Sequence, residues 1–186
     1  MKRFKYSLAL IFIISLLLHC SKQYKEAAPF LDGLFLEYET DVKTFAGREK
    51  IKTVYNVHSL GNDRFKITKT ENQTFFGDGV KEYFVDSYGK VYESSCRECE
   101  GKFSPIWIPA HTMEIGDTFD ERKIIKRNKW NQWNVVVVKS QISAIGAEWY
   151  YDANTGFLVG VYTSDAIGGK VTRKLINTNA NILVVQ

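Results

Sequence analysis

Hydrophobic and polar residues alternate along much of the chain after residue 33, and a period of two predicts β-strands. In residues 34–43, apolar residues and a threonine occupy one face, while the other face is mainly charged. Residues 51–57 and 64–70 repeat this alternation, with turn residues such as glycine and asparagine between the segments. The even spacing of short strands and turns predicts an antiparallel meander.

Later segments extend the meander. Residues 133–142 contain four consecutive valines, which predicts a strand that is buried on both faces. Residues 86–89 and 152–156 are rich in turn residues, and each predicts a hairpin between the segments that flank it. Residues 113–117 allow one helical turn, and no longer helix is predicted. The remaining predicted strands are 82–85, 90–93, 124–125, 147–151, 157–163, 170–176 and a short one at 182–185.

The number of strands limits the fold. About nine or ten strands in one domain must close on themselves or pack face to face. The sequence therefore predicts an all-β, mainly antiparallel domain, built as a single curved sheet, a half-barrel, a barrel or a sandwich. The half-barrel is similar in class to the lipid-carrier fold of lipoprotein-sorting proteins. That family also has covering helices, which this sequence does not predict.

The start of the chain has a different pattern. Three basic residues precede an uncharged apolar run at 7–18, which suits the core of a signal peptide and is shorter than the ~20 residues that span a bilayer. We expect a signal peptide at 1–20 and a short polar tether at 21–33. Residues 34–186 then form a single β-rich domain, a length that supports one sizeable core.

The end of the leader carries a more specific signal. Residues 17–20, Leu-Leu-His-Cys, resemble the lipobox of bacterial lipoproteins, with Leu17 at the usual −3 position and Cys20 at the invariant cysteine. His19 departs from the small residue that the family has there. The resemblance implies acylation of Cys20, a membrane as partner and a location in the cell envelope, and Ser21 after the cysteine favours the outer membrane if there are two. The alternatives are an uncleaved anchor or a plain signal peptide with an incidental cysteine.

Removal of the leader changes the net charge. The whole chain has 25 Lys and Arg against 21 Asp and Glu, a formal charge of +4. Three of these basic residues and none of the acidic ones lie in the leader, which leaves 22 against 21 and a charge of +1. A nearly neutral domain has no electrostatic footprint for nucleic acid, so we predict no nucleic-acid partner. The net charge does not decide whether residues 123–129 form a local basic patch, and this alternative is kept.

Cys96 and Cys99 form the one local motif with chemistry. Exported proteins meet oxidising conditions, so we predict a disulfide that stiffens residues 94–101 more than it stabilises the fold. The alternatives are a redox couple, free thiols, or a tetrahedral metal site with His58 and His111. Redox motifs of this spacing open a helix in a βαβ unit, whereas strands surround this one, and nothing in the spacing favours the metal. We therefore predict no metal and no cofactor.

Trp130 and Trp133 lie among polar residues where a hairpin tip is expected. An exposed tryptophan pair could contact lipid headgroups, glycan or a partner protein. The alternative is a turn whose two rings fold back over the sheet.

The chain has no GxSxG, HExxH or phosphate-binding glycine loop, and we predict a non-catalytic protein. Our first hypothesis is a membrane-anchored lipoprotein whose β-domain binds or carries a lipid or an envelope polymer, and it predicts an apolar groove or cavity. The second is an interaction or scaffold component of an envelope assembly, which predicts an exposed apolar patch or an uncovered strand edge. The third is a thiol redox protein that uses Cys96 and Cys99.

Overall fold

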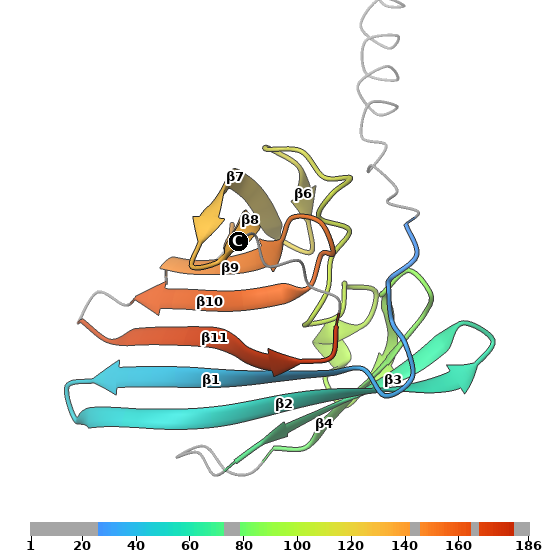
Figure 1. Cartoon of the computed structure of the whole chain (residues 1–186), viewed down its shortest axis with the longest axis horizontal. Coiled ribbons are helices and arrows are strands. Elements are labelled where there is room, and N and C mark those ends of the chain that lie inside the picture. Colours follow the sequence, from blue (N-terminus) through green and yellow to red (C-terminus); the bar gives the residue numbers. More distant parts are fainter. Residues whose placement is uncertain (1–25, 73–78, 142–145, 165–167, 181–186) are drawn as a thin grey trace, which may run out of the picture.

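The computed structural model describes residues 26–72, 79–141, 146–164 and 168–180, and within them eleven β-strands form one open, curved antiparallel sheet (Figure 1). This confirms the all-β fold class, as a single curved sheet. The elements are β1 (Phe35–Thr44), β2 (Gly47–Gly61), β3 (Arg64–Glu71), β4 (Lys81–Val85), β5 (Val91–Ser94), the 3₁₀ helix η1 (Arg97–Cys99), β6 (Thr118–Phe119), β7 (Arg122–Trp130), β8 (Trp133–Ser140), β9 (Gly146–Asp152), β10 (Leu158–Ser164) and β11 (Lys170–Thr178).

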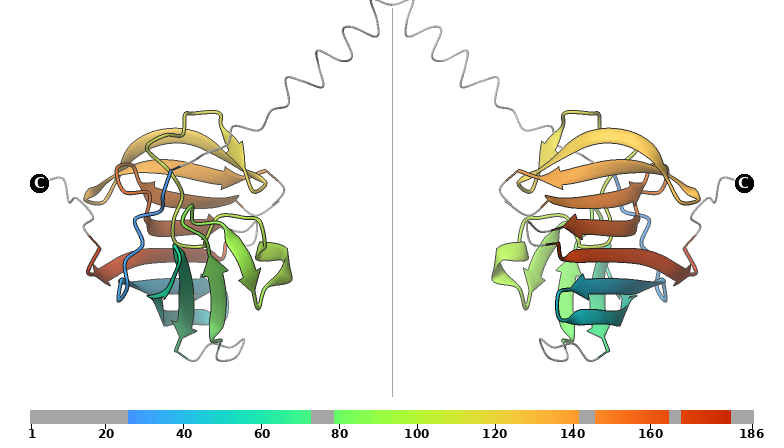
Figure 2. Two further views of the ribbon diagram at one scale, coloured as in Figure 1. Left: turned by 90° about the vertical axis from the view of Figure 1, so that its right-hand side faces the viewer. Right: turned by 90° about the vertical axis from the view of Figure 1, so that its left-hand side faces the viewer.

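The strand order is β5-β4-β3-β2-β1-β11-β10-β9-β8-β7-β6, so the first and last strands of the sheet along the chain pair at its centre. The short strands β5 and β6 form the two edges and do not pair with each other in the described part of the chain. Strand twist and several β-bulges bend the sheet into an open trough (Figure 2). The inside of this curve is the concave face.

The alternation of the sequence sorts residues between the two faces of the sheet. Leu36 and Tyr38 of β1 are buried on the concave face, as the period of two predicts. Glu37 and Glu39 point to the outer face, where Glu37 forms an ion pair with Lys52 of β2 at 2.7 Å. Exposed pairs of this kind contribute only about 0–1 kcal/mol each, so burial on the concave face is the main source of stability.

Two irregular segments cover the concave face in place of helices (Figure 2). One is the covering segment, residues 95–117, and the other is the N-terminal strap, residues 26–34. Trp107 lies at their junction with no exposed surface, and its ring makes edge-to-face contacts with Phe30 of the strap and Phe103 of the covering segment. Aromatic rings thus fill the space between these segments and the sheet.

The strap differs from the polar tether that the sequence predicts at 21–33. Its backbone is fixed to the sheet, because Ala28 N–H donates to Ser87 O at 2.7 Å and Gly33 N–H donates to Val57 O at 3.0 Å. Phe30 is buried in the core. The signal for this docking is the group of apolar residues Phe30, Leu31 and Leu34, of which Phe30 and Leu34 are buried.

Two further expectations differ from the structure. Residues 118–130 form the β6–β7 hairpin, with Asp120 and Glu121 at positive φ in the turn, instead of one strand through 124–125. Strand β7 lies next to the sheet edge and carries mainly exposed charged residues, so it lacks the alternation that marks a strand. Residues 113–117 form turns, and η1 is the one helix of the described residues.

The prediction for the four valines is confirmed. Val135, Val136, Val137 and Val138 of β8 are all buried, on alternating faces of the sheet. The signal peptide with Cys20, residues 21–25 of the tether and the predicted strand at 182–185 lie outside the described residues. Within the described residues, no helix has the length and hydropathy needed to span a membrane.

Candidate functional site

A cavity of about 240 Å³ lies on the concave face, between the covering segment and the sheet. Its wall is mainly aromatic and aliphatic, and three cations lie within that wall: Arg122 of β7, Arg173 of β11 and Lys102 of the covering segment. The apolar and aromatic lining residues are Tyr55, Tyr83, Val91, Phe103, Pro105, Trp149, Tyr151, Leu158 and Val161.

Strand register brings part of this wall together. Trp149 of β9 pairs with Val161 of β10, which pairs with Arg173 of β11. Residues that pair across neighbouring antiparallel strands point to the same face, about 5 Å apart. An indole ring, a branched aliphatic side chain and a guanidinium group therefore form one row in the cavity wall.

Arg122 lies at one side of the cavity and is held by β9 and by the β6–β7 turn. Its Nη1 donates to the Tyr151 hydroxyl at 3.1 Å, and its Nη2 donates to Asp120 Oδ2 at 3.3 Å. The same carboxylate accepts the Phe103 backbone N–H at 2.7 Å and lies 3.7 Å from the Lys90 ammonium group. Asp120 thus connects the β6–β7 turn, the covering segment and Arg122.

Arg173 lies in a second ionic group on the concave face. Its Nε donates to Thr40 Oγ1 at 2.9 Å, and its Nη2 lies 3.4 Å from Glu71 Oε1. Glu71 is bound more closely by Lys69 at 2.6 Å and also accepts the Thr53 hydroxyl at 3.1 Å. Burial alone raises the pKa of Glu71, but the hydrogen bonds from Lys69 and Thr53 and the charge of Arg173 outweigh it, and the pKa lies below its usual value.

We expect Glu71→Gln to lower the free energy of unfolding by about 1–3 kcal/mol at neutral pH, because it leaves two partly buried cations without a carboxylate. Since the folded pKa is lowered, the stabilisation is present above the ordinary pKa of a glutamic acid and is lost as the pH falls through the folded value. Urea unfolding at several pH values measures the difference between the two proteins.

The matched control is Glu82→Gln, which removes the more exposed ion pair with Lys66. Its effect at neutral pH is expected to stay below about 1 kcal/mol. A Glu71→Gln effect that does not shrink on acidification would contradict the charge-based explanation.

Tyr55 and Tyr83 also line the cavity. Tyr55 is 3% exposed, and burial raises its pKa and that of Tyr83, so both are neutral. Neither hydroxyl has a hydrogen bond to another described residue, whereas the neighbouring Tyr38 hydroxyl donates to Leu158 O at 2.7 Å. Tyr55 and Tyr83 thus keep free donors in the cavity wall.

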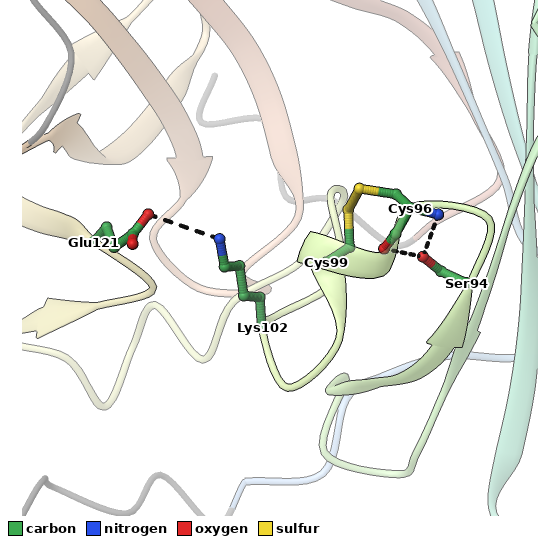
Figure 3. Close-up of a disulfide and its surroundings, with 5 residues drawn as sticks. All are labelled: Ser94, Cys96, Cys99, Lys102 and Glu121. Atoms are coloured by element: carbon green, nitrogen blue, oxygen red, sulfur yellow. Dashed lines mark hydrogen bonds and ion pairs between the residues drawn. A yellow bond between two sulfur atoms is a disulfide. The ribbon is translucent and has the colours of Figure 1, made fainter.

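The structure pairs Cys96 with Cys99 in a disulfide, as the sequence predicts (Figure 3). The disulfide joins the residue before η1 to the last residue of η1. Cys99 also forms part of the cavity wall. Cys96 is held further by Ser94, whose hydroxyl accepts the Cys96 N–H and donates to the Cys96 carbonyl. Farther along the same segment, the Lys102 ammonium group lies 3.7 Å from the Glu121 carboxylate of the β6–β7 turn (Figure 3). The disulfide therefore stiffens one wall of the cavity.

The alternatives for these cysteines find little support in the geometry. The helix η1 has three residues, so it offers no helix N-terminus of the kind that lowers a thiol pKa. In the alternative metal site, His111 Nε2 lies 3.0 Å from Glu26 Oε1. Among the described residues, no three histidine, cysteine or acidic side chains come together as metal ligands.

Trp130 and Trp133 fold back over the outer face of the sheet. Trp133 is 7% exposed, and the half-buried Trp130 ring stacks between it and Tyr150, with a centroid distance of 4.8 Å to Tyr150. The Trp130 ring also covers Gly160, where any added Cβ would overlap it. The tryptophan pair therefore packs on the outer face and is separate from the concave cavity.

A second hollow, of about 420 Å³, lies beside turns and the strap. It is lined by residues such as Glu26, Leu31, Thr155 and Asn179, and none of its lining residues belongs to a strand. The concave cavity is the better candidate site, because rows of paired strands hold its side chains on a rigid scaffold.

Part of the site has a signal in the sequence. In a strand, residues i, i+2 and i+4 share one face. On β3, Lys69 and Glu71 alternate with the same phase as the buried Ile67, and on β11, Arg173 has the phase of the inward-facing residues. Charged residues at these inward-facing positions are therefore the sequence signal of the site. Arg122 has no such signal, because the β6–β7 turn that places it is not evident from the sequence.

Comparison with known proteins assigns no family. No protein-family model matches the chain, and no curated protein matches it. Among solved structures, an exported protein with a YmcC-like fold from Bacteroides fragilis aligns over 83% of this chain and 99% of its own, at 12% identity and a TM-score of 0.47. An outer membrane lipoprotein-sorting protein domain from Vibrio parahaemolyticus aligns over 82% and 86%, at 10% identity and a TM-score of 0.32. A LolA superfamily protein from Nitrosomonas europaea aligns over 85% and 90%, at 10% identity and a TM-score of 0.30.

Proposed function

We propose that this chain is a lipid-anchored, non-catalytic protein of the bacterial cell envelope, whose curved sheet binds the apolar part of a lipid or of an envelope polymer. The observation that carries the proposal is the cavity on the concave face, with its aromatic and aliphatic wall. Small-molecule sites are typically concave and mostly apolar, with a few polar groups that fix orientation. A concave face filled completely by side chains would have argued against this function.

The size of the cavity limits what it holds. Sites for drug-sized ligands occupy roughly 300–1,000 Å³, and this cavity is smaller, at about 240 Å³. It therefore suits one chain or one ring of a larger amphipathic molecule, whose remainder stays outside.

The leader supports the anchor. Residues 17–20 resemble a lipobox, and several acyl chains on Cys20 would hold the protein stably on a membrane. The strap contacts the rest of the domain from Glu26, which lies 3.0 Å from His111, so residues 20–25 link the proposed anchor to it. At about 3.3–3.6 Å per extended residue, the domain stays within roughly 20 Å of the membrane. This short link keeps the cavity close to envelope lipids, and Ser21 favours the outer membrane.

A scaffold role is the second candidate, and exposed apolar residues favour it. Eight large hydrophobic residues are exposed in the described part of the chain, and Phe45 at the β1–β2 turn is the most exposed of them, at 92%. However, the edge strands β5 and β6 have four and two residues, so they present few unpaired backbone groups to a partner strand. Ligand binding therefore has the stronger support.

One labelling experiment tests both parts of the proposal. Cells that express the full chain are fed a fatty acid bearing a diazirine and an alkyne, and labelled peptides are mapped with and without light. We expect light-independent label on a mature N-terminal peptide that begins at Cys20. We also expect light-dependent label on peptides that contain Trp149 and Val161, because these residues line the cavity.

Val161→Trp fills the cavity and is expected to reduce the light-dependent label there by about tenfold, while the label at Cys20 stays. Tyr162→Trp is the matched control, since the adjacent residue of β10 points to the outer face, where it pairs with Glu148. Thermal unfolding of both variants verifies that they fold. Unchanged cavity labelling in Val161→Trp would exclude this cavity as the binding site, and an unlabelled N-terminus would exclude the anchor.

A further inference from the structure

Two ionic groups adjoin the cavity, and each supplies one arginine to its wall. Asp120 is shared by Lys90 and Arg122, and the Asp86 carboxylate also acts on Lys90. Glu71 is shared by Lys69 and Arg173, which leaves one excess positive charge in the second group. The side chains of Arg122 and Arg173 are 16% and 22% exposed, so little water screens their charges.

Both guanidinium groups keep donors that the protein does not use. Arg122 donates through Nη1 and Nη2 and Arg173 through Nε and Nη2, and within the described residues Arg122 Nε and Arg173 Nη1 have no acceptor. The side chain of Tyr55, a buried residue of the cavity wall, also lacks a hydrogen bond to another described residue. These donors are therefore available to an acceptor on a ligand that enters the cavity.

The apolar part of the wall adjoins both arginines. The Arg122 guanidinium carbon lies 5.7 Å from the centre of the Trp149 ring. Trp149 pairs with Val161, and Val161 pairs with Arg173 on the next strand. A ligand that rests on Trp149 and Val161 therefore lies beside both guanidinium groups, which belong to the same cavity wall.

We propose that the cavity recognises an amphipathic anion, with its carboxylate or phosphate group bound by Arg122 and Arg173 and its apolar part against Trp149 and Val161. The proposal rests on the function proposed above and adds the charge of the ligand. Guanidinium groups bind both kinds of anion through paired N–H donors, so the chemistry shared by carboxylates and phosphates defines the ligand class.

The test uses the full chain in phosphatidylcholine vesicles at alkaline pH, where fatty acids are ionised. The vesicles contain one of three diazirine probes with the same alkyl chain: the carboxylic acid, its methyl ester, or the phosphate monoester of the matching alcohol. Cross-link yield is measured on peptides that contain Trp149 and Val161. We expect an anionic probe to label these peptides about tenfold more than the methyl ester, and the more strongly labelling anion identifies the headgroup.

Arg122→Gln and Arg173→Gln are each expected to reduce labelling by the anionic probe to near the level of the ester, and to leave ester labelling unchanged. Unchanged ester labelling also shows that the cavity is intact in each variant. Arg48→Gln is the matched control, because Arg48 pairs with Asp41 on the outer face, and it should label like the unmodified protein.

The remaining outcomes separate this inference from the function on which it rests. Equal labelling by acid, phosphate and ester would overturn charge recognition and leave apolar binding intact. No cavity labelling by any probe would overturn both. Inorganic phosphate in large excess is expected to leave the label in place, and complete displacement by it would show a site for a free anion and overturn the amphipathic ligand.

Discussion

Replacement of Trp107 by alanine is expected to lower the free energy of unfolding by about 3–5 kcal/mol, the usual cost of truncating a fully buried aromatic residue. The ring has no exposed surface and contacts Phe30 and Phe103. Its Nε1 donates to Thr155 O at 2.8 Å, so truncation also removes a hydrogen bond between the covering segment and the β9–β10 turn. Because the free energy of unfolding of a small domain is only about 5–15 kcal/mol, this single substitution removes a large share of the stability of the fold.

Urea unfolding followed by circular dichroism measures this loss. Phe45→Ala is the control, since Phe45 is exposed in the β1–β2 turn and its removal is expected to change stability by less than about 0.5 kcal/mol. Similar small losses in both variants would show that the covering segment does not form part of the core.

Gly156→Ala is expected to cost about 3 kcal/mol or more, because two effects add. Gly156 has a φ of +76°, which an L-residue with a Cβ adopts only with strain. A Cβ there would also overlap the carbonyl oxygen of Ile108 and lie 2.9 Å from Trp107 Nε1. The β9–β10 turn would have to move away from the covering segment and lose the hydrogen bond from Ile108 N–H to Gly156 O.

Gly101→Ala isolates the first effect, the backbone strain. Gly101 also has a φ of +76°, but an added Cβ has no neighbouring atom within 4 Å. We expect this control to lose only the conformational part, about 1–2 kcal/mol. The difference in midpoint between the two variants in urea measures the steric part, and equal losses would show that the turn and the covering segment are not tightly packed.

These two positions show how the cavity is maintained. Trp107 and Gly156 fix the covering segment against the sheet, and residues 102–105 of that segment form one wall of the cavity. The disulfide at Cys96 and Cys99 stiffens the adjoining part of that wall. The ligand site therefore depends on an irregular segment that is held by packing, a turn glycine and one short cross-link.

The pattern of the sequence predicted the strands well where one face is buried. Residues 34–43 alternate because β1 has a buried concave face and a charged outer face, and the four valines of β8 are buried on both faces. Strand β7 was recognised only in part, since exposed charges near a sheet edge remove the alternation. A strand can thus be predicted from the sequence when one face is buried and the other exposed, or when both faces are buried.

The sequence by itself determined the all-β class, most strands and hairpins, the pairing of two nearby cysteines and the expectation of an anchored envelope protein. All of these depend on residues that are close along the chain. Only the tertiary structure decided that the sheet stays open, that an irregular segment covers it, and that Arg122, Trp149 and Arg173 share one cavity. The reason is physical: register between distant strands, and packing of a segment without a repeating pattern, depend on contacts that local sequence does not encode.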